Sequence, residues 1–362
     1  MPNTRPDDIT LVTGGSGSIG VPLLESLGRD GRTAVALVRG GLPVNVAGVQ
    51  LVEGDIQSAG LGLDAGWRDE LLTRVTAIVH GAALTRFDAP LDTARAVNVE
   101  GTRRVLEFAE RCTRLERVTV LSTIYVAGKR TGIIRETELD HDCGFVNAYE
   151  QSKYEAEQLA RAAMARLPVM VVRLSTVVGA HGSGAVGKPA AIHHAMRFLY
   201  NSLLPMMPGT DDSLVDLIST GYAVAAIRHL SERGFTRGAT FHVCAAGEAP
   251  REAELIDLVV EAFMRYRPAW RRRAIEKPSI VELPTFELFR ESVEAVADPV
   301  LRASVAVLAP FAPQLAFPKI FDDTQCRAIL DGAGIHRDAI RDTLKDVVRF
   351  LIETNWTPPC RS

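Results

Sequence analysis

The chain has 362 residues, enough to bury one large hydrophobic core or slightly more than one domain. Hydrophobic residues make up 47% and charged residues 23%, as in ordinary soluble globular proteins. The formal net charge of -3 excludes the global basic field that would attract nucleic acid or an anionic membrane.

The sequence carries no signal for export, for membrane insertion or for a disulfide framework. Residues 1–10 lack a basic and an apolar segment, and the apolar run 303–316 is broken by Pro310 and Pro313. The five cysteines are scattered without a Cys-x-x-Cys pair, which argues against both disulfides and a zinc site. We therefore expect a cytoplasmic protein with no transmembrane segment and no metal site.

A glycine-rich loop follows the first apolar run of the chain. Residues 9–12 are mostly apolar, and residues 13–20 read TGGSGSIG before a segment predicted to be helical. Gly14 permits a turn off a strand, Gly17 lets the backbone approach a pyrophosphate, and Gly20 lets the helix pack on the strand. Because N–H groups at a helix start attract phosphate, the loop predicts a dinucleotide site.

Strands and helices alternate over the first half of the chain. Strands are predicted at residues 9–12, 33–38, 51–56, 75–80, 118–121 and 169–174, and helices at residues 21–27, 98–110 and 148–166. This alternation predicts an α/β fold with a doubly wound parallel sheet of the Rossmann type. Ligands of such sheets bind beyond the carboxyl ends of the strands.

Two charged residues stand at these strand ends. Arg39 follows the second strand, where an acidic residue would hold the ribose hydroxyls of NAD. A cation there favours the 2′-phosphate of NADP(H) over NAD, and a solvated arginine at a strand end is the alternative. Asp55 ends the third strand, where its carboxylate could accept from an adenine amino group or cap the next turn.

The next strands end in small and hydroxylic residues. Residues 81–83, Gly-Ala-Ala, leave space for the nicotinamide end of a cofactor, and Thr123 closes the fifth strand. Tyr149 and Lys153 lie four residues apart on the following helix and so share a face. An adjacent ammonium lowers the pKa of a phenol, so this pair is predicted to be a proton-transfer group.

The pattern changes after residue 180, and the last third is predicted to be mainly helical. We expect a loop at 181–188, an apolar helix at 192–207, a strand and helix at 214–230, and a strand at 240–244 that returns to the sheet. The predicted units are an NADP-binding domain at 1–180, joined by a strand at about 235–247, and an interleaved substrate-binding region at 181–234 and 248–362.

With these residues in place, the chain resembles the extended short-chain dehydrogenase/reductase family. The matching segments are TGGSGSIG at 13–20, GDI at 54–56, HGAA at 80–83, NVEGT at 98–102, LSTIYVAG at 121–128 and YEQSK at 149–153. Residues 214–227 and 318–330 are most similar to the thioester reductase and fatty acyl reductase branch, of the male sterility type. Leu174 and Gly221 depart from the proline and aspartate common in relatives.

The resemblance implies roles for the residues at the strand ends. Tyr149 would protonate a carbonyl oxygen, Thr123 would hydrogen-bond the same oxygen, and Lys153 would lower the tyrosine pKa and hold ribose hydroxyls. Asn98 would support a proton-relay water or simply start a helix. The implied cofactor-binding residues are Gly14, Gly17, Ser18, Ile19, Gly20, Arg39, Asp55, Ile56, Gly81, Ala82, Ala83, Asn98, Lys153, Leu174 and Val177.

The branch implies an NADP(H)-dependent reductase of an acyl thioester, carried by coenzyme A or an acyl-carrier protein. The product would be an aldehyde or an alcohol. The alternatives are an enzyme that acts on a nucleotide sugar, a sterol-like alcohol or another carbonyl, and a non-catalytic NADP-sensing protein. Homodimers are common in this family, and the charge balance predicts no nucleic-acid partner.

Two features of the later region have more than one interpretation. The apolar stretches 192–207 and 305–316 could line an acyl tunnel, form a dimer interface or belong to the core. A basic cluster with interleaved aromatic residues could dock an acidic carrier protein or coenzyme A phosphates, or form a solvated helical face. The cluster comprises Arg265, Tyr266, Arg267, Trp270, Arg271, Arg272 and Arg273.

Overall fold

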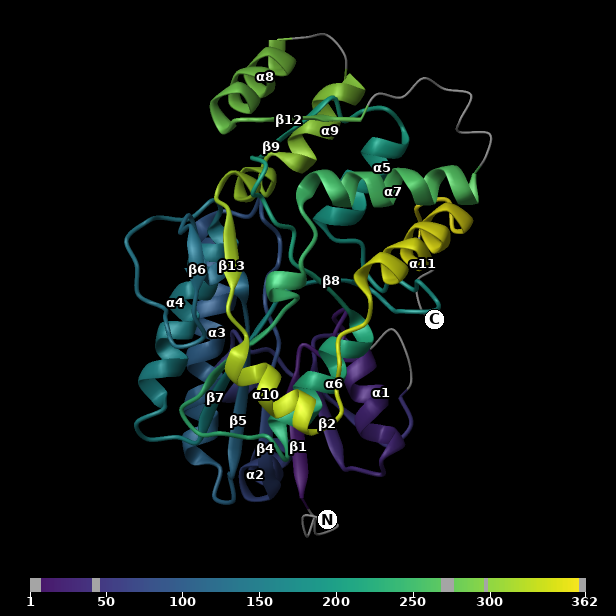
Figure 1. The fold of residues 1–362 in the computed structure, drawn as a ribbon. Coiled ribbons are helices and arrows are strands. Elements are labelled where there is room, and N and C mark those ends of the chain that lie inside the picture. The colour runs from purple at the N-terminus through teal and green to yellow at the C-terminus, as the bar shows by residue number, and fades with distance from the viewer. Residues whose placement is uncertain (1–7, 41–45, 268–276, 296–298, 358–362) are drawn as a thin grey trace.

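The computed structural model describes residues 8–40, 46–267, 277–295 and 299–357. Its main sheet consists of β1 (Ile9–Thr13), β2 (Ala34–Val38), β3 (Val49–Glu53), β4 (Val75–His80), β5 (Arg117–Thr123), β7 (Val169–Leu174) and β11 (Thr240–Val243). Neighbouring strands are all parallel, in the order β11-β7-β5-β4-β1-β2-β3 (Figure 1). The predicted doubly wound α/β sheet is therefore confirmed, including the late strand that returns to it.

The side chains of the sheet alternate between two apolar layers. In β1, Ile9 and Leu11 belong to one core cluster, whereas Val12 belongs to the other. The first cluster contains buried residues of α2 (Ala65–Arg74), α3 (Leu91–Arg111) and α4 (Ala148–Ala163). The second contains residues of α1 (Gly20–Arg29), α6 (Thr220–Ser231) and α10 (Thr324–Gly332). Helices thus cover both faces of the sheet.

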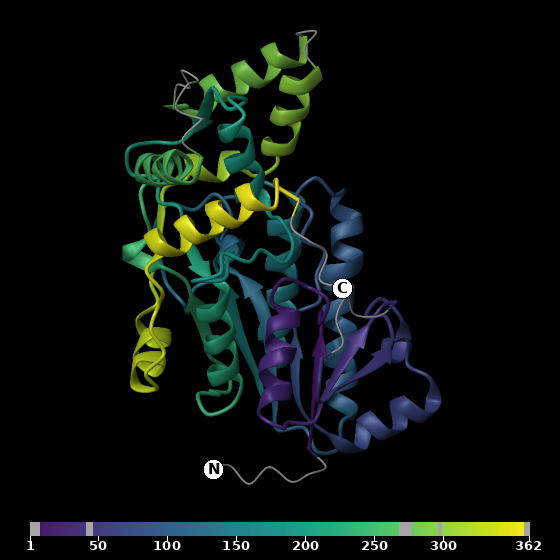
Figure 2. The same cartoon turned by 90° about the vertical axis from the view of Figure 1, so that its right-hand side faces the viewer.

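A mainly helical region lies beyond the upper end of the sheet in Figures 1 and 2. It has its own core cluster, to which α5 (Ala191–Tyr200), α7 (Glu252–Tyr266), α8 (Leu283–Ala295), α9 (Pro299–Leu308) and α11 (Ile340–Glu353) contribute. Segments from before and after the late strand β11 build this core together. The helical region is therefore interleaved with the sheet in the sequence.

Three short parallel ladders join segments that are distant in the sequence. They pair β8 (Thr176–Gly179) with β10 (Leu217–Ser219), β9 (Met206–Pro208) with β12 (Ser279–Val281), and β6 (Gly132–Ile134) with β13 (Lys319–Phe321). Short 3-10 helices are η1 (Ala59–Gly62), η2 (Ile124–Ala127), η3 (Ala246–Glu248) and η5 (Ala312–Ala316). The ladder of β6 and β13 brings the C-terminal region beside the sheet (Figure 1).

Several element boundaries differ from the sequence predictions, among them the end of β3 at Glu53, which leaves Asp55 in the turn that follows the strand. Helix α3 begins at Leu91 and not at Asn98. The sequence did not predict its first seven residues, because Ala94 is the single buried residue among them and they show little apolar periodicity. The apolar segment 192–207 is helical only to Tyr200, and its last residues form strand β9. The helix-start interpretation of Asn98 is therefore wrong.

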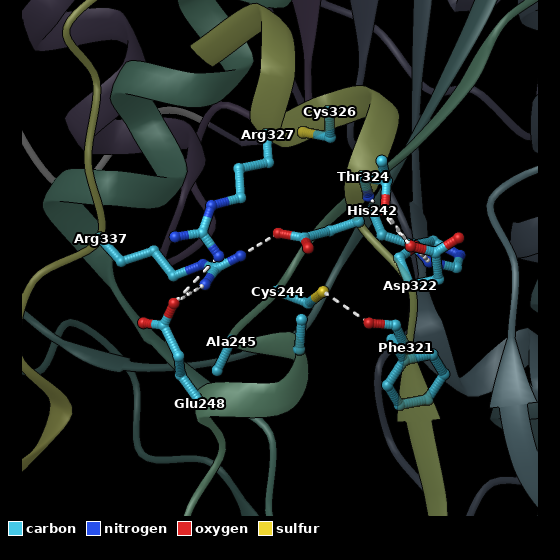
Figure 3. A network of polar contacts seen from close by, with 12 residues as sticks. His242, Cys244, Ala245, Glu248, Phe321, Asp322, Thr324, Cys326, Arg327 and Arg337 are labelled. Atoms are coloured by element: carbon cyan, nitrogen blue, oxygen red, sulfur yellow. Dashed lines mark hydrogen bonds and ion pairs between the residues drawn. The ribbon is translucent and has the colours of Figure 1, made fainter. Parts of the chain in front are cut away.

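Polar contacts fasten the C-terminal region to the late strand of the sheet. Figure 3 shows Arg337 directed at Glu248, and its guanidinium also pairs with Asp323. Beside this pair, the Asp322 carbonyl lies 2.8 Å from Nδ1 of His242 on β11. Residues beyond α10 are therefore fixed to the edge of the sheet.

Glu252 is a buried carboxyl at the first position of α7. Neither of its side-chain oxygens has a hydrogen-bond partner among the described residues. The carboxyl packs so closely on Gly209 that a Cβ there would collide with it. Burial raises the pKa of Glu252 to about 8, so the carboxyl is protonated in the folded chain at neutral pH.

We expect Glu252→Gln to remove a pH-dependent loss of stability. Between the unfolded pKa of about 4.3 and the folded value, the unfolded chain releases a proton that the folded chain retains, so stability falls as pH rises. Urea denaturation gives the free energy of unfolding of the variant and of wild type at each pH. The variant's value minus the wild-type value should increase from pH 5 to pH 8, by an amount on the order of 2 kcal/mol. Glu261→Gln, an exposed position on the same helix, is the control. Parallel pH dependences of Glu252→Gln and wild type would contradict the expectation.

Candidate active site

The glycine loop packs tightly against the segment that follows β4. Gly14 has φ +78°, and a Cβ on it would lie 2.6 Å from the backbone nitrogen of Ala82. A Cβ on Gly20 would collide with the Gly14 carbonyl, which also accepts the Gly17 N–H at 3.0 Å. Gly14 and Gly20 therefore allow the backbone approaches that a side chain would prevent.

The start of α1 has no side-chain cap and lies in an exposed part of the glycine loop. Ile19 precedes the helix without a side-chain cap, and its first turn contains no acidic residue. Ser16, Gly17 and Ser18 are exposed, and Gly187 from the later glycine-rich loop lies close to Ser18. An uncapped helix start with accessible N–H groups binds an anion, so this loop fits the diphosphate of a dinucleotide cofactor.

A buried hydrogen-bonded chain holds residues 81–83 beside this loop. Thr102 donates to the Asn98 carbonyl at 2.6 Å, so its hydroxyl oxygen is free to accept from Nε2 of His80 at 3.0 Å. Nδ1 of His80 then accepts from the Thr13 hydroxyl at 2.7 Å, and Thr13 accepts the Ala82 N–H at 3.2 Å. Burial lowers the pKa of His80 to about 3, which keeps the ring neutral. The motif HGAA contained this histidine, but its structural partners could not be read from the sequence.

Arg39 and Asp55 lie next to each other at neighbouring strand ends. The Arg39 side chain is 74% exposed, and its Nη1 is 3.8 Å from Oδ2 of Asp55. Oδ1 of Asp55 accepts the Gln57 N–H at 2.9 Å, so the predicted turn cap is present. Ile56 is buried, and its side chain packs on Gly101 of α3. Of these residues, Arg39 is the one that is free to reach a ligand.

Thr123, Tyr149 and Lys153 meet at the carboxyl end of β5. Thr123 is the last residue of that strand, and its side chain lies close enough to Tyr149 to lower the pKa of the phenol. One turn further along α4, Nζ of Lys153 donates to the Leu121 carbonyl at 2.9 Å. The strand residue Thr123 and the helix residues Tyr149 and Lys153, predicted from two segments, therefore form one cluster.

The protonation of this cluster differs from the expectation. Burial raises the pKa of Tyr149 to about 12, and the nearby Thr123 side chain only partly opposes this. Burial also lowers the pKa of Lys153 to about 8, against the attraction of Glu157. The expected lowering of the tyrosine pKa by the adjacent lysine is wrong for this structure, because burial of the phenol is the larger effect. Tyr149 is therefore a protonated donor at neutral pH.

Asn98 lies in the middle of α3 and ties three segments together. Its Oδ1 accepts the Leu84 N–H at 2.7 Å, and its Nδ2 donates to the Leu84 carbonyl at 3.1 Å. Nδ2 also donates to the Ser152 hydroxyl at 2.9 Å. Both polar side-chain atoms of Asn98, Oδ1 and Nδ2, thus have protein partners. Through these bonds Asn98 positions the loop after β4 against α4.

The remaining predicted residues lie around the glycine loop. Gly81 donates its N–H to the Thr13 carbonyl at 3.1 Å, and Ala83 is partly buried in the same segment. Leu174 at the end of β7 and Val177 in β8 pack, together with Ile19, against the same apolar core. These residues are therefore available to line the space above the sheet.

A buried ion pair beneath the cluster was missed from the sequence. Arg173 on β7 and Glu157 on α4 are 1% and 0% exposed, and their closest atoms, Nη2 and Oε1, are 2.7 Å apart. Ser122 donates to Glu157 at 2.6 Å, and Nη1 of Arg173 lies 2.9 Å from Nε2 of His242. A charged pair inside a strand and a helix gives no periodic signal, so only the tertiary structure reveals it.

The structure bears on the apolar stretches 192–207 and 305–316 and on part of the basic cluster. Met196, Leu199 and Leu308 are buried in the helical core, which favours the core interpretation of the apolar stretches. Arg265 lies 5.7 Å from the ring of Tyr266 at the end of α7. Four other members of the basic cluster lie outside the described residues, namely Trp270, Arg271, Arg272 and Arg273.

The described residues contain neither a cluster of metal ligands nor a membrane-spanning helix. No three His, Cys, Asp or Glu side chains within the placed segments are grouped as metal ligands would be. None of the helices that the structure describes combines the length and apolarity needed to cross a bilayer.

Comparison with known proteins gives a consistent picture. The model of the male sterility protein family matches residues 44–227, half of the chain. An isonitrile lipopeptide synthase of Streptomyces coeruleorubidus is 33% identical over 204 residues, covering 50% of this chain and 14% of that protein. A fatty acyl-CoA reductase of Drosophila melanogaster, wat, is 24% identical over 164 residues, covering 38% of this chain and 32% of that protein.

A solved structure covers nearly the whole chain. The terminal R domain from the myxalamid PKS-NRPS biosynthetic pathway superposes with a TM-score of 0.81 and 25% identity, over 97% of this chain and 92% of that one. By contrast, the chain spans less than a third of either curated relative described above, 14% and 32% of their lengths. The likeness in fold therefore extends across both the sheet and the helical region.

We expect Gly14→Ala to weaken dinucleotide binding by at least about tenfold, because the new Cβ meets the Ala82 backbone at a positive φ. Gly31→Ala is the matched control, since Gly31 has φ +66° but no atom within 4 Å of its Cβ position. Both variants carry the same type of backbone strain, and the control should bind normally. Titration of NADPH fluorescence measures binding, and equal affinities of the two variants would refute the role of Gly14.

Proposed function

The chain belongs to the male sterility protein family, an NAD(P)-dependent reductase branch of the extended short-chain dehydrogenases, and on that premise we propose that it reduces an acyl thioester with NADP(H). The observation that carries the proposal is the convergence of Thr123, Tyr149 and Lys153 at the end of β5. This cluster lies at the same edge of the sheet as the glycine loop. The product is an aldehyde, or an alcohol after a second reduction.

The proposed cofactor is NADP(H), which supplies a hydride when it is bound. The uncapped start of α1 would hold its diphosphate, and Arg39 would bind its 2′-phosphate. Arg39 is exposed, and its 3.8 Å separation from Asp55 leaves its donors available to a phosphate. A carboxylate at the Arg39 position would repel that group.

The proposed proton donor is the Tyr149 hydroxyl. Because burial raises its pKa to about 12, Tyr149 carries its proton at neutral pH and can give it to the substrate oxygen. Thr123 would donate a hydrogen bond to the same oxygen, and Lys153 would interact with ribose hydroxyls. With hydride on the carbonyl carbon and this proton on the oxygen, a thioester becomes a hemithioacetal. Cleavage of its C–S bond then releases aldehyde and thiol.

The thioester would be carried by coenzyme A or by a carrier protein. Relatives named a fatty acyl-CoA reductase and a lipopeptide synthase, and the R domain of a PKS-NRPS pathway, support this substrate class. The names of those three proteins each indicate a role in acyl or peptidyl chemistry.

Replacement of Tyr149 by Phe tests the chemistry. We expect Tyr149→Phe to lower kcat for NADPH-dependent thiol release from acyl-CoA by about 100-fold or more, because the proton donor is lost. NADPH binding should be nearly unchanged, since the phenol hydroxyl is directed at Thr123. Thiol release is followed with a chromogenic disulfide beside loss of NADPH absorbance. Full activity of the variant would reject Tyr149, and turnover of nucleotide sugars or hydroxysteroids alone would reject the thioester substrate.

Replacement of Arg39 tests the cofactor preference. Loss of a charge-assisted contact costs about 1.5–3 kcal/mol, so Arg39→Ala should weaken NADPH binding by about 10-fold to 100-fold. Its affinity for NADH, which lacks the 2′-phosphate, should change little. Arg103→Ala, which removes an exposed arginine paired with Glu100 on α3, is the control for the loss of a surface charge. An equal effect on both cofactors would contradict the role of Arg39.

A further inference from the structure

Two phenylalanines adjoin the proposed proton donor. The Phe87 ring meets the Tyr149 ring edge-on, with centroids 5.3 Å apart and an interplanar angle of 80°. The Phe311 ring lies 6.1 Å from that of Phe87. All three residues are of intermediate exposure, so part of this apolar surface is open to a ligand, while enough protein surrounds Tyr149 to raise the pKa of its phenol. Phe311 lies in the apolar stretch 305–316, and neither phenylalanine belongs to a motif that the sequence reveals.

Polar contacts hold the segment of Phe311 in place above α4. Its neighbour Pro310 accepts at its carbonyl from Nδ2 of Asn147 at 3.0 Å. Three residues further on, Nε2 of Gln314 donates to Oε1 of Glu150 at 2.7 Å. The Leu315 carbonyl accepts from Ser213 at 2.6 Å. The ring of Phe311 is therefore presented by an anchored segment.

The charged groups beside this aromatic surface already have protein partners, including Lys153, whose Nζ donates to the Leu121 carbonyl. Arg86 and Asp88 flank Phe87 in the sequence, but both are exposed and they pair with each other at 2.9 Å. Glu150, next to Tyr149, accepts from Asn147 and Gln314, and burial raises its pKa to about 7. A polar or charged substituent placed against the rings would lose hydration without gaining a partner.

We propose that Phe87 and Phe311 are specificity-determining residues that receive the apolar part of the acyl group next to the carbonyl. The inference rests on the proposed function, because Tyr149 locates that carbonyl. A substrate whose oxygen bonds the phenol hydroxyl has its first acyl carbons within reach of rings that adjoin Tyr149. The surface then favours acyl groups that carry hydrocarbon at these carbons and disfavours groups that carry a carboxylate there.

A matched pair of substrates tests the proposal. Butyryl-CoA and succinyl-CoA both carry a four-carbon acyl group, and they differ in a terminal methyl or carboxylate. We expect wild type to prefer butyryl-CoA, and Phe87→Ala and Phe311→Ala each to reduce the ratio of the two kcat/KM values by about tenfold or more. Phe87→Leu and Phe311→Leu keep an apolar surface and should retain most of the preference.

A control variant and a second substrate pair distinguish failure of the phenylalanine proposal from failure of the proposed function. Phe317→Ala removes a ring from the same segment that adjoins Lys129 and Lys319 instead of Tyr149, and it should leave the ratio unchanged. The same ratios are measured with butanal and succinic semialdehyde. Turnover with unchanged ratios in folded Ala variants would overturn the role of the two phenylalanines alone. Absence of turnover with all four compounds would overturn the proposed function and this inference with it.

Discussion

The buried pair of Arg173 and Glu157 is the contact on which the geometry of the site depends. It joins β7 to α4, and through Ser122 and His242 it also reaches β5 and β11. Ser122 directly precedes Thr123, and Glu157 lies one helical turn after Lys153. Removal of one partner of such a pair leaves an unpaired buried charge and costs about 3–5 kcal/mol. The pair thus sets the position of β5 relative to the helix that carries the proton donor.

Burial, more than spacing, decides the protonation of the proposed catalytic residues. The four-residue interval between Tyr149 and Lys153 predicts that they share a helix face, and both do lie on α4. The interval carries no information on how deeply either group is buried, and burial moves the two pKa values in opposite directions. The phenol is consequently suited to donate a proton in reduction, which is the role expected from the sequence, although its pKa moves in the direction opposite to the expected one.

Local patterns predicted the features that neighbouring residues determine. The glycine loop, the parallel doubly wound sheet and the returning strand β11 follow from period, turn residues and spacing. Contacts between distant segments have no such signature. The chain from Thr13 through His80 to Thr102, and the meeting of Phe87 with Phe311, arise only when the tertiary structure brings their elements together.

The pairing of β6 with β13 has a consequence for how the chain folds. Residues 132–134 lie early in the chain, yet their only ladder partner among the described residues is 319–321. Contacts of large sequence separation are slow to form, and during synthesis they wait for the later segment to emerge. The ladder can therefore form only after residue 321 has been synthesised, and the same holds for the packing of α10 on the sheet face that α1 also covers. This nucleotide-binding type of sheet is thus fully covered on both faces only when almost the whole chain is present.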